Sequence, residues 1–195
     1  KTLQAHGQFQ VLSALRRGPW GVEGLNERIA RMLHEADLIP ASEGWYLGRP
    51  VLVTRNDYGL GLMNGDIGIT LRRPGADRTS WSLRVAFPAV DDAQGIKWVL
   101  PSRLQAVETV YALTVHKSQG SEFTHAVLVL PDTLNPILTR ELIYTGITRA
   151  KAWLTLAHAG SVKVLGQAIA RRVLRMSGLM ASDQSKRAGE TGEPQ

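Results

Sequence analysis

The sequence predicts an α/β protein in which a parallel sheet with covering helices is interrupted by a small β-barrel. Segments with strand-like and helix-like patterns alternate before residue 45 and after residue 110, which is typical of a parallel α/β layer. Between these positions the apolar segments are short and are separated by turn residues, which favours a small all-β unit. Hydrophobic residues make up 44% of the 195-residue chain, so the composition is that of a globular protein with a buried core.

The N-terminal part predicts one strand and one helix. Residues 9–15 are predominantly apolar, as expected for a buried strand, and the Gly-Pro-Trp-Gly at residues 18–21 predicts a turn. Apolar residues recur at spacings of three and four from Leu25 to Ala36, which predicts an amphipathic helix of about four turns. Pro40 is expected to end this helix.

The middle of the chain, residues 45–110, predicts a small barrel. Its expected strands are residues 50–54, 68–71, 81–87 and 96–100. Turn-forming residues such as the Asn-Gly-Asp at positions 64–66 separate them. Strands at this spacing suggest an SH3-like barrel, and a segment of this size suits an insert better than an independent enzyme.

The C-terminal part predicts a second alternation of strands and helices. Strands are expected at residues 126–130 and 152–157, and helices at residues 138–150 and 162–173. The residues expected to face inward are Leu142, Ile143, Ile147 and Ala150 on the first helix, and Val162, Leu165, Ile169 and Val173 on the second. Residues 182–195 are polar and contain Gly and Ser, which favours a flexible tail.

Composition excludes several classes of protein. The chain has no Cys, which rules out disulfides and thiolate metal sites, and its five His residues show no ligand spacing, so no metal site is predicted. No run of about 18 apolar residues occurs and no signal peptide opens the chain, so no membrane span is predicted and the cytoplasm is the expected location. The net charge of +6 favours a polyanionic partner, most simply a nucleic acid. The chain begins at Lys1 rather than Met, which suggests a piece of a longer protein.

The first segment that could carry chemistry is residues 114–123, Thr-Val-His-Lys-Ser-Gln-Gly-Ser-Glu-Phe. It precedes the strand expected at residues 126–130 and should lie at the edge of the sheet, where a ligand can reach it. A glycine among small polar and basic residues lets the main chain approach a phosphate closely. An ordinary surface loop with solvated side chains explains the same pattern, and spacing alone does not choose between the two.

The second such segment is residues 142–150, Leu-Ile-Tyr-Thr-Gly-Ile-Thr-Arg-Ala. Arg149 is expected at the end of a helix. Arginine suits a phosphoryl-transfer site because it stays charged and binds phosphate oxygens with a planar fork of donors. A solvated arginine stabilised by the helix dipole is the alternative.

Together and in this order, the two segments resemble motifs V and VI of the superfamily 1 helicases. Residues 55–68 resemble the segment before motif V in the RecD-like branch of that superfamily, and residues 9–26 resemble its motif IV region. The resemblance extends from about residue 8 to residue 180. Lys117 and Gln119 also fit the motif V pattern, although the resemblance assigns them no definite role.

The resemblance implies roles for five residues. Arg149 corresponds to the motif VI arginine that reaches the γ-phosphate of the nucleotide across a cleft between two motor domains. Gly120 and Glu122 correspond to motif V positions near the nucleotide, with the glutamate near its ribose. Thr114 and His116 correspond to the part of the motif that lies toward single-stranded DNA.

The resemblance also implies a division of the chain. Residues 1–44 and 111–181 would form a RecA-like domain, 2A, residues 45–110 an SH3-like insert, 2B, and residues 182–195 a tail. The sequence contains no Gly-x-x-x-x-Gly-Lys-Ser/Thr and no convincing Mg²⁺-binding acidic motif. In this family both lie in an N-terminal motor domain. ATP and Mg²⁺ would be held mainly by that domain, and this chain alone should be inactive as an ATPase.

The activity implied by the resemblance is that of an ATP-dependent DNA helicase. It would move 5′→3′ on single-stranded DNA during double-strand break repair and recombination. Its partners would be the DNA and the RecB-like and RecC-like subunits of a heterotrimer, with no membrane involved.

Three other functions are compatible with parts of the sequence. The first is a non-catalytic DNA-binding or subunit-docking module in which the helicase motifs are idle. The second is a self-contained phosphohydrolase, against which the missing P-loop argues strongly. The third is an SH3-type peptide binder, although aromatic residues in a small barrel more often belong to its core. Its groove would be lined by Trp45, Tyr46, Tyr58, Trp81 and Trp98.

Overall fold

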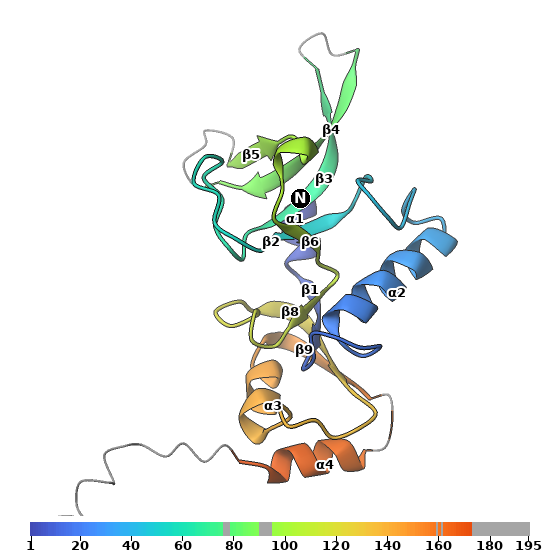
Figure 1. Cartoon of the computed structure of the whole chain (residues 1–195), viewed down its shortest axis with the longest axis vertical. Helices are drawn as coiled ribbons and strands as arrows, with labels where there is room; N and C mark the ends of the chain where they lie inside the picture. The colour runs from blue at the N-terminus through green and yellow to red at the C-terminus, as the bar shows by residue number, and fades with distance from the viewer. Residues whose placement is uncertain (76–78, 90–94, 159, 161, 173–195) are drawn as a thin grey trace, which may run out of the picture.

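The computed structural model describes residues 1–75, 79–89, 95–158, 160 and 162–172, and it contains two sheets. Figure 1 shows them at different levels along the long axis of the molecule, with the antiparallel sheet toward one end and the parallel sheet and its C-terminal helices toward the other. The first segment of the chain, up to residue 35, belongs to the parallel unit. The chain then forms the antiparallel sheet between residues 50 and 109, and it returns to the parallel unit at residue 112.

Four strands form the parallel sheet in the order β7-β1-β8-β9. They are β1 (Phe9–Ser13), β7 (Ala112–Thr114), β8 (Phe123–Leu130) and β9 (Ala150–His158). Side chains that follow one another in a strand point to opposite faces of the sheet. The apolar runs in β1 and β8 therefore supply two separate cores, one on each face.

Helices α2 (Val22–Glu35), α3 (Arg140–Ile147) and α4 (Lys163–Ala170) cover the two faces of the parallel sheet. The short helix α1 (Thr2–His6) precedes β1 and buries no residue. On one face, Leu25 of α2 packs in a cluster with Ala112 and Val129. On the other, Leu142 of α3 belongs to the larger core that contains Leu128, to which α4 also contributes.

The antiparallel sheet has five strands in the order β5-β4-β3-β2-β6. They are β2 (Pro50–Val53), β3 (Ile67–Pro74), β4 (Trp81–Pro88), β5 (Ile96–Val99) and β6 (Val107–Thr109), with a 3₁₀ helix, η1 (Pro101–Arg103), after β5. Its core includes Val51, Val85 and Phe87. Gly68 allows the Phe87 ring to pack against β3, because a Cβ at this position would lie 2.7 Å from Cε1 of that ring.

The two sheets share a core where the chain passes between them. Leu52 of β2 and Val110 belong to the same apolar cluster as the centre of the parallel sheet. The main-chain N–H of Val110 donates to the carbonyl of Pro50 (3.1 Å), so the antiparallel segment begins and ends at one place. The hydroxyls of Tyr46 and Tyr111 lie 3.0 Å apart, and burial together with this hydrogen bond raises the pKa of Tyr111 above its usual value.

The predicted parallel sheet with helices is confirmed, and the predicted strands in the middle of the chain are present as an antiparallel sheet. Among the described residues β5 and β6 lie at the two ends of the strand order. Closure into an SH3-like barrel, and the domain boundaries after residues 44, 110 and 181, stay predictions.

The helix expected at residues 138–150 is shorter than predicted. It ends at Ile147, because Ala150 pairs with Phe123 and starts β9. Leu142 and Ile143 are buried as expected. Ile147 is exposed, so its predicted inward position is wrong, as is that of Ala150 on a helix.

The predicted inner face of the last helix is also wrong. Val164 and Ala168, one turn apart, are buried in the core that contains the α3 residues. Val162 and Ile169 are exposed: Val162 precedes the helix as its N-cap, and Ile169 lies beside the buried Ala168 but off the face that carries Val164 and Ala168. Leu165 packs at the margin of the core, and the predicted positions of Val173 and of the tail at residues 182–195 lie outside the described residues.

Candidate functional site

Residues 114–121 leave strand β7 as a compact turn. Oγ1 of Thr114 accepts a hydrogen bond from the main-chain N–H of Lys117 (3.2 Å), and the Thr114 carbonyl accepts one from that of Ser118 (3.1 Å). The Ser118 side chain is fully buried and donates to the carbonyl of Val115 (2.8 Å). One side of the turn is therefore anchored in the protein. The exposed residues of this part of the turn are His116, Lys117 and Gln119.

Gly120 occupies a left-handed conformation in this turn. Its φ is +84°, which favours glycine over any residue with a Cβ. No atom lies within 4 Å of the place that a Cβ would take. The need for glycine is therefore conformational, and the space above its main chain is open, as the approach of a ligand would require.

Arg149 joins the two predicted motifs. Its guanidinium donates from Nε to the carbonyl of Thr145 (3.1 Å), from Nη1 to the carbonyl of Ser121 (3.0 Å), and from Nη2 to Oγ1 of Thr148 (3.2 Å). Its own carbonyl accepts from the main-chain N–H of Phe123 (2.8 Å). Arg149 lies two residues beyond α3 rather than in its last turn, so these hydrogen bonds, and not a helix end, fix its position.

The positive charge of Arg149 is not neutralised by these three side-chain contacts, because all three acceptors are uncharged oxygens. A guanidinium has five N–H donors. The three hydrogen bonds leave two of them for another acceptor. The side chain is thus oriented by the protein and still able to bind an anion.

Glu122 directly precedes β8, next to Phe123, whose main-chain N–H bonds to the carbonyl of Arg149. Its carboxylate is 3.4 Å from Nζ of Lys151 in β9, and both side chains are more than half exposed. An ion pair this exposed contributes little to stability. The Glu122 carboxylate is therefore accessible and is not held in one place by the fold.

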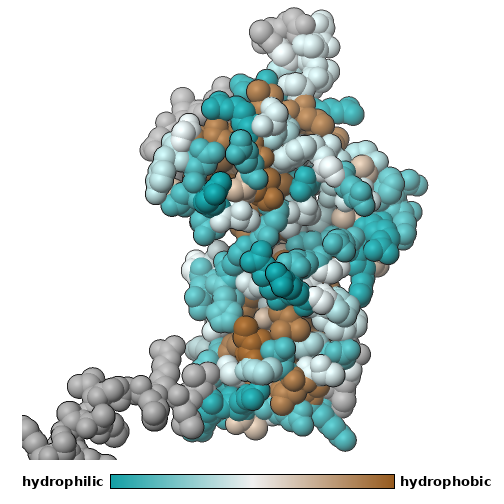
Figure 2. All heavy atoms as spheres, in the orientation of Figure 1, coloured by the Kyte–Doolittle hydropathy of each residue, from teal (hydrophilic) through white to brown (hydrophobic). Residues whose placement is uncertain are grey.

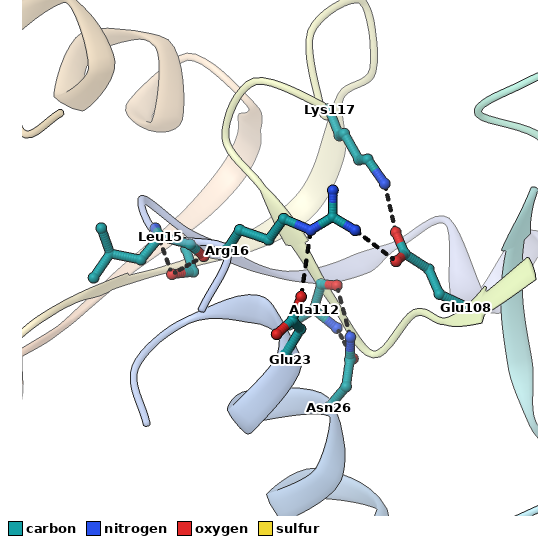
Figure 3. A network of polar contacts seen from close by, with 8 residues as sticks. Leu15, Arg16, Glu23, Asn26, Glu108, Ala112 and Lys117 are labelled. Atoms are coloured by element: carbon teal, nitrogen blue, oxygen red, sulfur yellow. Dashed lines mark hydrogen bonds and ion pairs between the residues drawn. The ribbon is translucent and has the colours of Figure 1, made fainter. Parts of the chain in front are cut away.

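A network of charged side chains contacts the same turn nearer its start. Nζ of Lys117 donates to Oε1 of Glu108, and Nη2 of Arg16 lies 3.7 Å from the second oxygen of that carboxylate. Nε of Arg16 in turn lies 3.4 Å from Oε1 of Glu23 in α2. Figure 3 shows Arg16 and Lys117 pointing toward Glu108 from different segments of the chain. Thr114 lines the pocket that these residues surround.

The structure brings the five predicted residues onto one turn and its immediate contacts. Gly120, Glu122 and Arg149 gather where Arg149 bonds to the turn, and Thr114 and His116 lie at its start. Their proposed roles toward nucleotide and DNA stay predictions. Figure 2 shows hydrophilic side chains in the region between the two sheets.

Sequence reasoning missed the polar residues that support this turn from other elements. Asn26 is buried in α2, where its Oδ1 accepts from the main-chain N–H of Ala112 (2.8 Å) and its Nδ2 contacts the carbonyl of the same residue (3.4 Å). It thereby satisfies the free edge of strand β7. The resemblance of residues 9–26 to motif IV was the only signal that pointed to Asn26. No spacing pointed to Arg16 or Glu108.

The five aromatic residues proposed to line a peptide groove are not gathered into one. Tyr46 is buried, whereas Tyr58 and Trp81 are largely exposed. No ring–ring contact joins any two of the five within the part of the chain that the structure describes. The guanidinium of Arg49 lies over Trp45, and that of Arg73 lies over Trp98.

Among the described residues, no group of three or more His, Cys, Asp or Glu side chains is placed to hold a metal ion. None of the described helices has the length and apolar character needed to cross a membrane.

Residues 109–157 match the family described as the UvrD-like helicase C-terminal domain. The matched stretch runs from the end of β6 through most of β9 and contains both motifs. This part of the chain is therefore a superfamily 1 helicase segment.

The chain is more specifically homologous to the RecD subunit of the RecBCD enzyme, and it belongs to the RecD-like helicases. It is 42% identical to RecD of Haemophilus influenzae over 172 residues, which are 87% of this chain and 24% of that protein. It is 41% identical to RecD of Mycobacterium tuberculosis over 188 residues, 96% of this chain and 30% of that protein. The chain thus spans about a quarter to a third of the length of these relatives.

Among solved structures, the chain is similar to a Pif1 helicase from Bacteroides in complex with ADP-AlF₃ and single-stranded DNA. The TM-score is 0.48 at 14% identity, and the similarity covers 96% of this chain and 48% of the other.

Proposed function

We propose that this chain is the C-terminal motor half of an ATP-dependent DNA helicase that moves 5′→3′ on single-stranded DNA during double-strand break repair and recombination. The observation that carries the proposal is the hydrogen bond from Arg149 to Ser121, which joins motif VI to motif V. A helicase motor needs the group that senses the nucleotide and the segment that faces DNA to move together. The homology to RecD supports the same function.

The residues of this chain fit one side of an ATP site. Arg149 has a charge that its protein contacts leave uncompensated, and two of its N–H donors are free to bind phosphate oxygens. Gly120 leaves its main chain open beside it, and the accessible Glu122 carboxylate could accept hydrogen bonds from a ribose. These three residues would hold the nucleotide from this side.

Bound ATP and Mg²⁺ would supply the phosphoanhydride chemistry that drives movement. The sequence has no P-loop, so the phosphates and the metal would be held mainly by an N-terminal motor domain. The contribution of this chain is a preoriented cation: the carbonyls of Thr145 and Ser121 fix the Arg149 guanidinium before a ligand arrives. Preorganised charge of this kind stabilises negative charge that develops during phosphoryl transfer.

On the DNA side we assign Thr114 and His116 different tasks. The Thr114 hydroxyl shapes the turn through its hydrogen bond from Lys117, whereas the exposed His116 side chain would contact the strand itself. Single-stranded DNA would be held mainly through its phosphates, with movement driven by opening and closing of the nucleotide cleft.

We also propose a domain arrangement for this chain and a set of partner subunits for the whole protein. The antiparallel sheet would be an SH3-like 2B insert in a RecA-like 2A domain. The whole protein would be the exodeoxyribonuclease V alpha subunit of a cytoplasmic heterotrimer with RecB-like and RecC-like subunits.

Unwinding by the full-length protein tests the proposed function. Duplexes with a single-stranded 5′ tail or 3′ tail would be incubated with ATP, and strand separation would be followed by fluorescence. Separation of the 5′-tailed duplex alone is expected, with none when a non-hydrolysable ATP analogue replaces ATP. The isolated chain should show no DNA-stimulated ATPase activity. Unwinding restricted to 3′ tails would contradict the polarity, and turnover that copurifies with the isolated chain would contradict the half-site.

A further inference from the structure

We infer that Lys117 acts as a positioning residue: Glu108 of the antiparallel sheet holds it, and this contact sets the shape of the turn that carries Thr114 and His116. The inference rests on the proposed function, because it concerns the DNA-facing side of that site. It assigns to Lys117 and Glu108 a role that neither the motif pattern nor the homology gives them.

The contacts of Glu108 connect three segments that are far apart in sequence. Its two carboxylate oxygens face Lys117 of the turn and Arg16, which follows β1. Glu108 itself lies in the middle of β6, the strand that ends the order of the antiparallel sheet. Figure 3 shows this carboxylate between the two cations. One side chain of the antiparallel sheet thus contacts both the motif V turn and the segment after β1.

The charges of this cluster balance. Arg16 and Lys117 contribute two positive charges, and Glu23 and Glu108 contribute two negative ones. A phosphate could reach Lys117 only in competition with a carboxylate that already binds it. His116, one residue earlier, is exposed and has no side-chain hydrogen bond within the described residues. The neighbouring histidine is therefore the better candidate for direct contact with DNA, and the lysine for support.

The path of the main chain strengthens this connection. Only Val110 and Tyr111 separate β6 from β7, and the motif V turn begins at the last residue of β7. Val110 is buried in the core that the two sheets share, and the Tyr111 hydroxyl bonds to Tyr46. A shift of β6 would therefore move the start of the turn through the main chain and through Glu108 at once.

The rival role for Lys117 is direct contact with a DNA phosphate, and salt dependence separates the two. A phosphate contact contributes about 0.7 to the slope of log affinity against log salt for a single strand. A lysine that only shapes the turn contributes nothing to that slope, although its removal still weakens binding.

The experiment uses full-length protein in four forms: Lys117→Met, Glu108→Gln, the double variant, and Glu27→Gln. The last removes an equal charge from the exposed face of α2 and serves as the control. Affinity for a fluorescent oligothymidine would be measured from low to high salt, together with the DNA concentration that half-maximally stimulates the ATPase. Each single variant should lower the affinity for the oligothymidine about two- to fivefold, as expected for one partly exposed ion pair. The DNA concentration that half-maximally stimulates the ATPase should rise by the same factor. The double variant should be no worse than either single one, and all salt slopes should equal that of the unmodified protein.

Three outcomes would overturn the inference. A slope shallower by about 0.7 in Lys117→Met, together with tighter binding by Glu108→Gln, would make Lys117 a phosphate contact. Additive effects of the two substitutions would show that the residues act separately. Equality of all variants with the control would show that the contact has no role.

A second readout keeps this test separate from the proposed function. Lys117→Met and Glu108→Gln should each lower the melting temperature by about 1–3 °C, again without additivity. If the unmodified protein showed no DNA-stimulated ATPase, the proposed function would fail, while the melting temperatures would still report whether Glu108 holds Lys117.

Discussion

The Nη1 atom of Arg149 lies 3.0 Å from the main-chain oxygen of Ser121 and donates a hydrogen bond to it. Ser121 belongs to the turn after β7, and Arg149 follows α3, so this contact crosses between two elements on the same edge of the parallel sheet. A guanidinium held by carbonyl oxygens keeps its full charge and has a fixed plane.

Replacing Arg149 by alanine in the full-length protein should collapse kcat for DNA-stimulated ATP hydrolysis. An arginine that stabilises the transferring phosphoryl group contributes about 10³–10⁵ in rate. Nucleotide affinity should change far less, since an N-terminal domain would hold most of the ligand. Arg149→Lys should rescue only partly, because lysine keeps the charge but cannot form the three oriented hydrogen bonds. Steady-state kinetics, nucleotide titration and melting curves check this, and a wild-type kcat in Arg149→Ala would favour the non-catalytic module.

Substitutions in the turn that we propose to face DNA should weaken binding to single strands in the full-length protein. His116→Ala removes an exposed side chain, and Thr114→Ala removes the acceptor for the Lys117 N–H. Each should reduce affinity about two- to tenfold, the range of one hydrogen bond. Thr114→Ser keeps the hydroxyl and serves as the matched control. Fluorescence anisotropy at several salt concentrations measures the effect. Equal losses from neutralising substitutions in residues 182–195 would indicate nonspecific attraction instead.

Asn26→Ala should destabilise the fold without altering any group assigned to the site. The substitution leaves the main-chain N–H of Ala112 without the Asn26 side chain as its partner, in a buried place. An unsatisfied buried group costs about 1–3 kcal/mol, so the melting temperature should fall by several degrees. Glu27→Ala, on the exposed face of the same helix, is the control and should stay near the unmodified value. An unchanged melting temperature in Asn26→Ala would mean that the edge of β7 needs no partner from α2.

Stability should fall as pH is lowered, in part because of His6. Burial lowers the pKa of His6 below its usual value near 6.5, and its Nε2 is buried without a partner. The unfolded chain therefore binds this proton more readily than the folded one, so the folded state loses stability as pH falls below about 6.5. Urea unfolding at pH 7.5 and pH 5.5 would measure the loss. His6→Gln should reduce the difference in the free energy of unfolding between the two pH values, and an unchanged difference would exclude His6 as a cause.

The sequence was most informative where one apolar period extends over several turns or strands. Helix α2 and strand β8 were expected from such patterns, and the parallel sheet followed from their alternation. Strands β6 and β7 have three residues each, which is too short for an alternating apolar pattern to be recognised in the sequence. Pairing with neighbouring strands alone defines them. The end of α3 was missed for a related reason, since pairing of Ala150 with Phe123 overrides a helical pattern that could have continued.

The predicted site shows the same limit. The five residues taken from the two motifs do lie on one turn and its contacts, because the turn ends directly before β8 and Arg149 directly precedes the neighbouring parallel strand β9. The partners that hold them could not be predicted. Ser121 acts through its main-chain oxygen, which any residue type would supply, and Glu108 reaches Lys117 from a strand of the other sheet. Contacts of this kind depend on the folded arrangement and leave no mark in spacing or composition.

The hydrogen bond between Val110 and Pro50 has a consequence for how the chain folds. Strand β7 must pair with β1, and the contact between Gln10 and Tyr111 at this junction spans 101 residues of sequence. Once the antiparallel sheet has formed, its two ends are adjacent, and the loop still to be closed is about two-fifths as long. The entropic cost of closing that loop then falls by about 0.8 kcal/mol, which lowers the barrier to pairing β1 with β7. Early folding of the antiparallel sheet would thus speed completion of the parallel one.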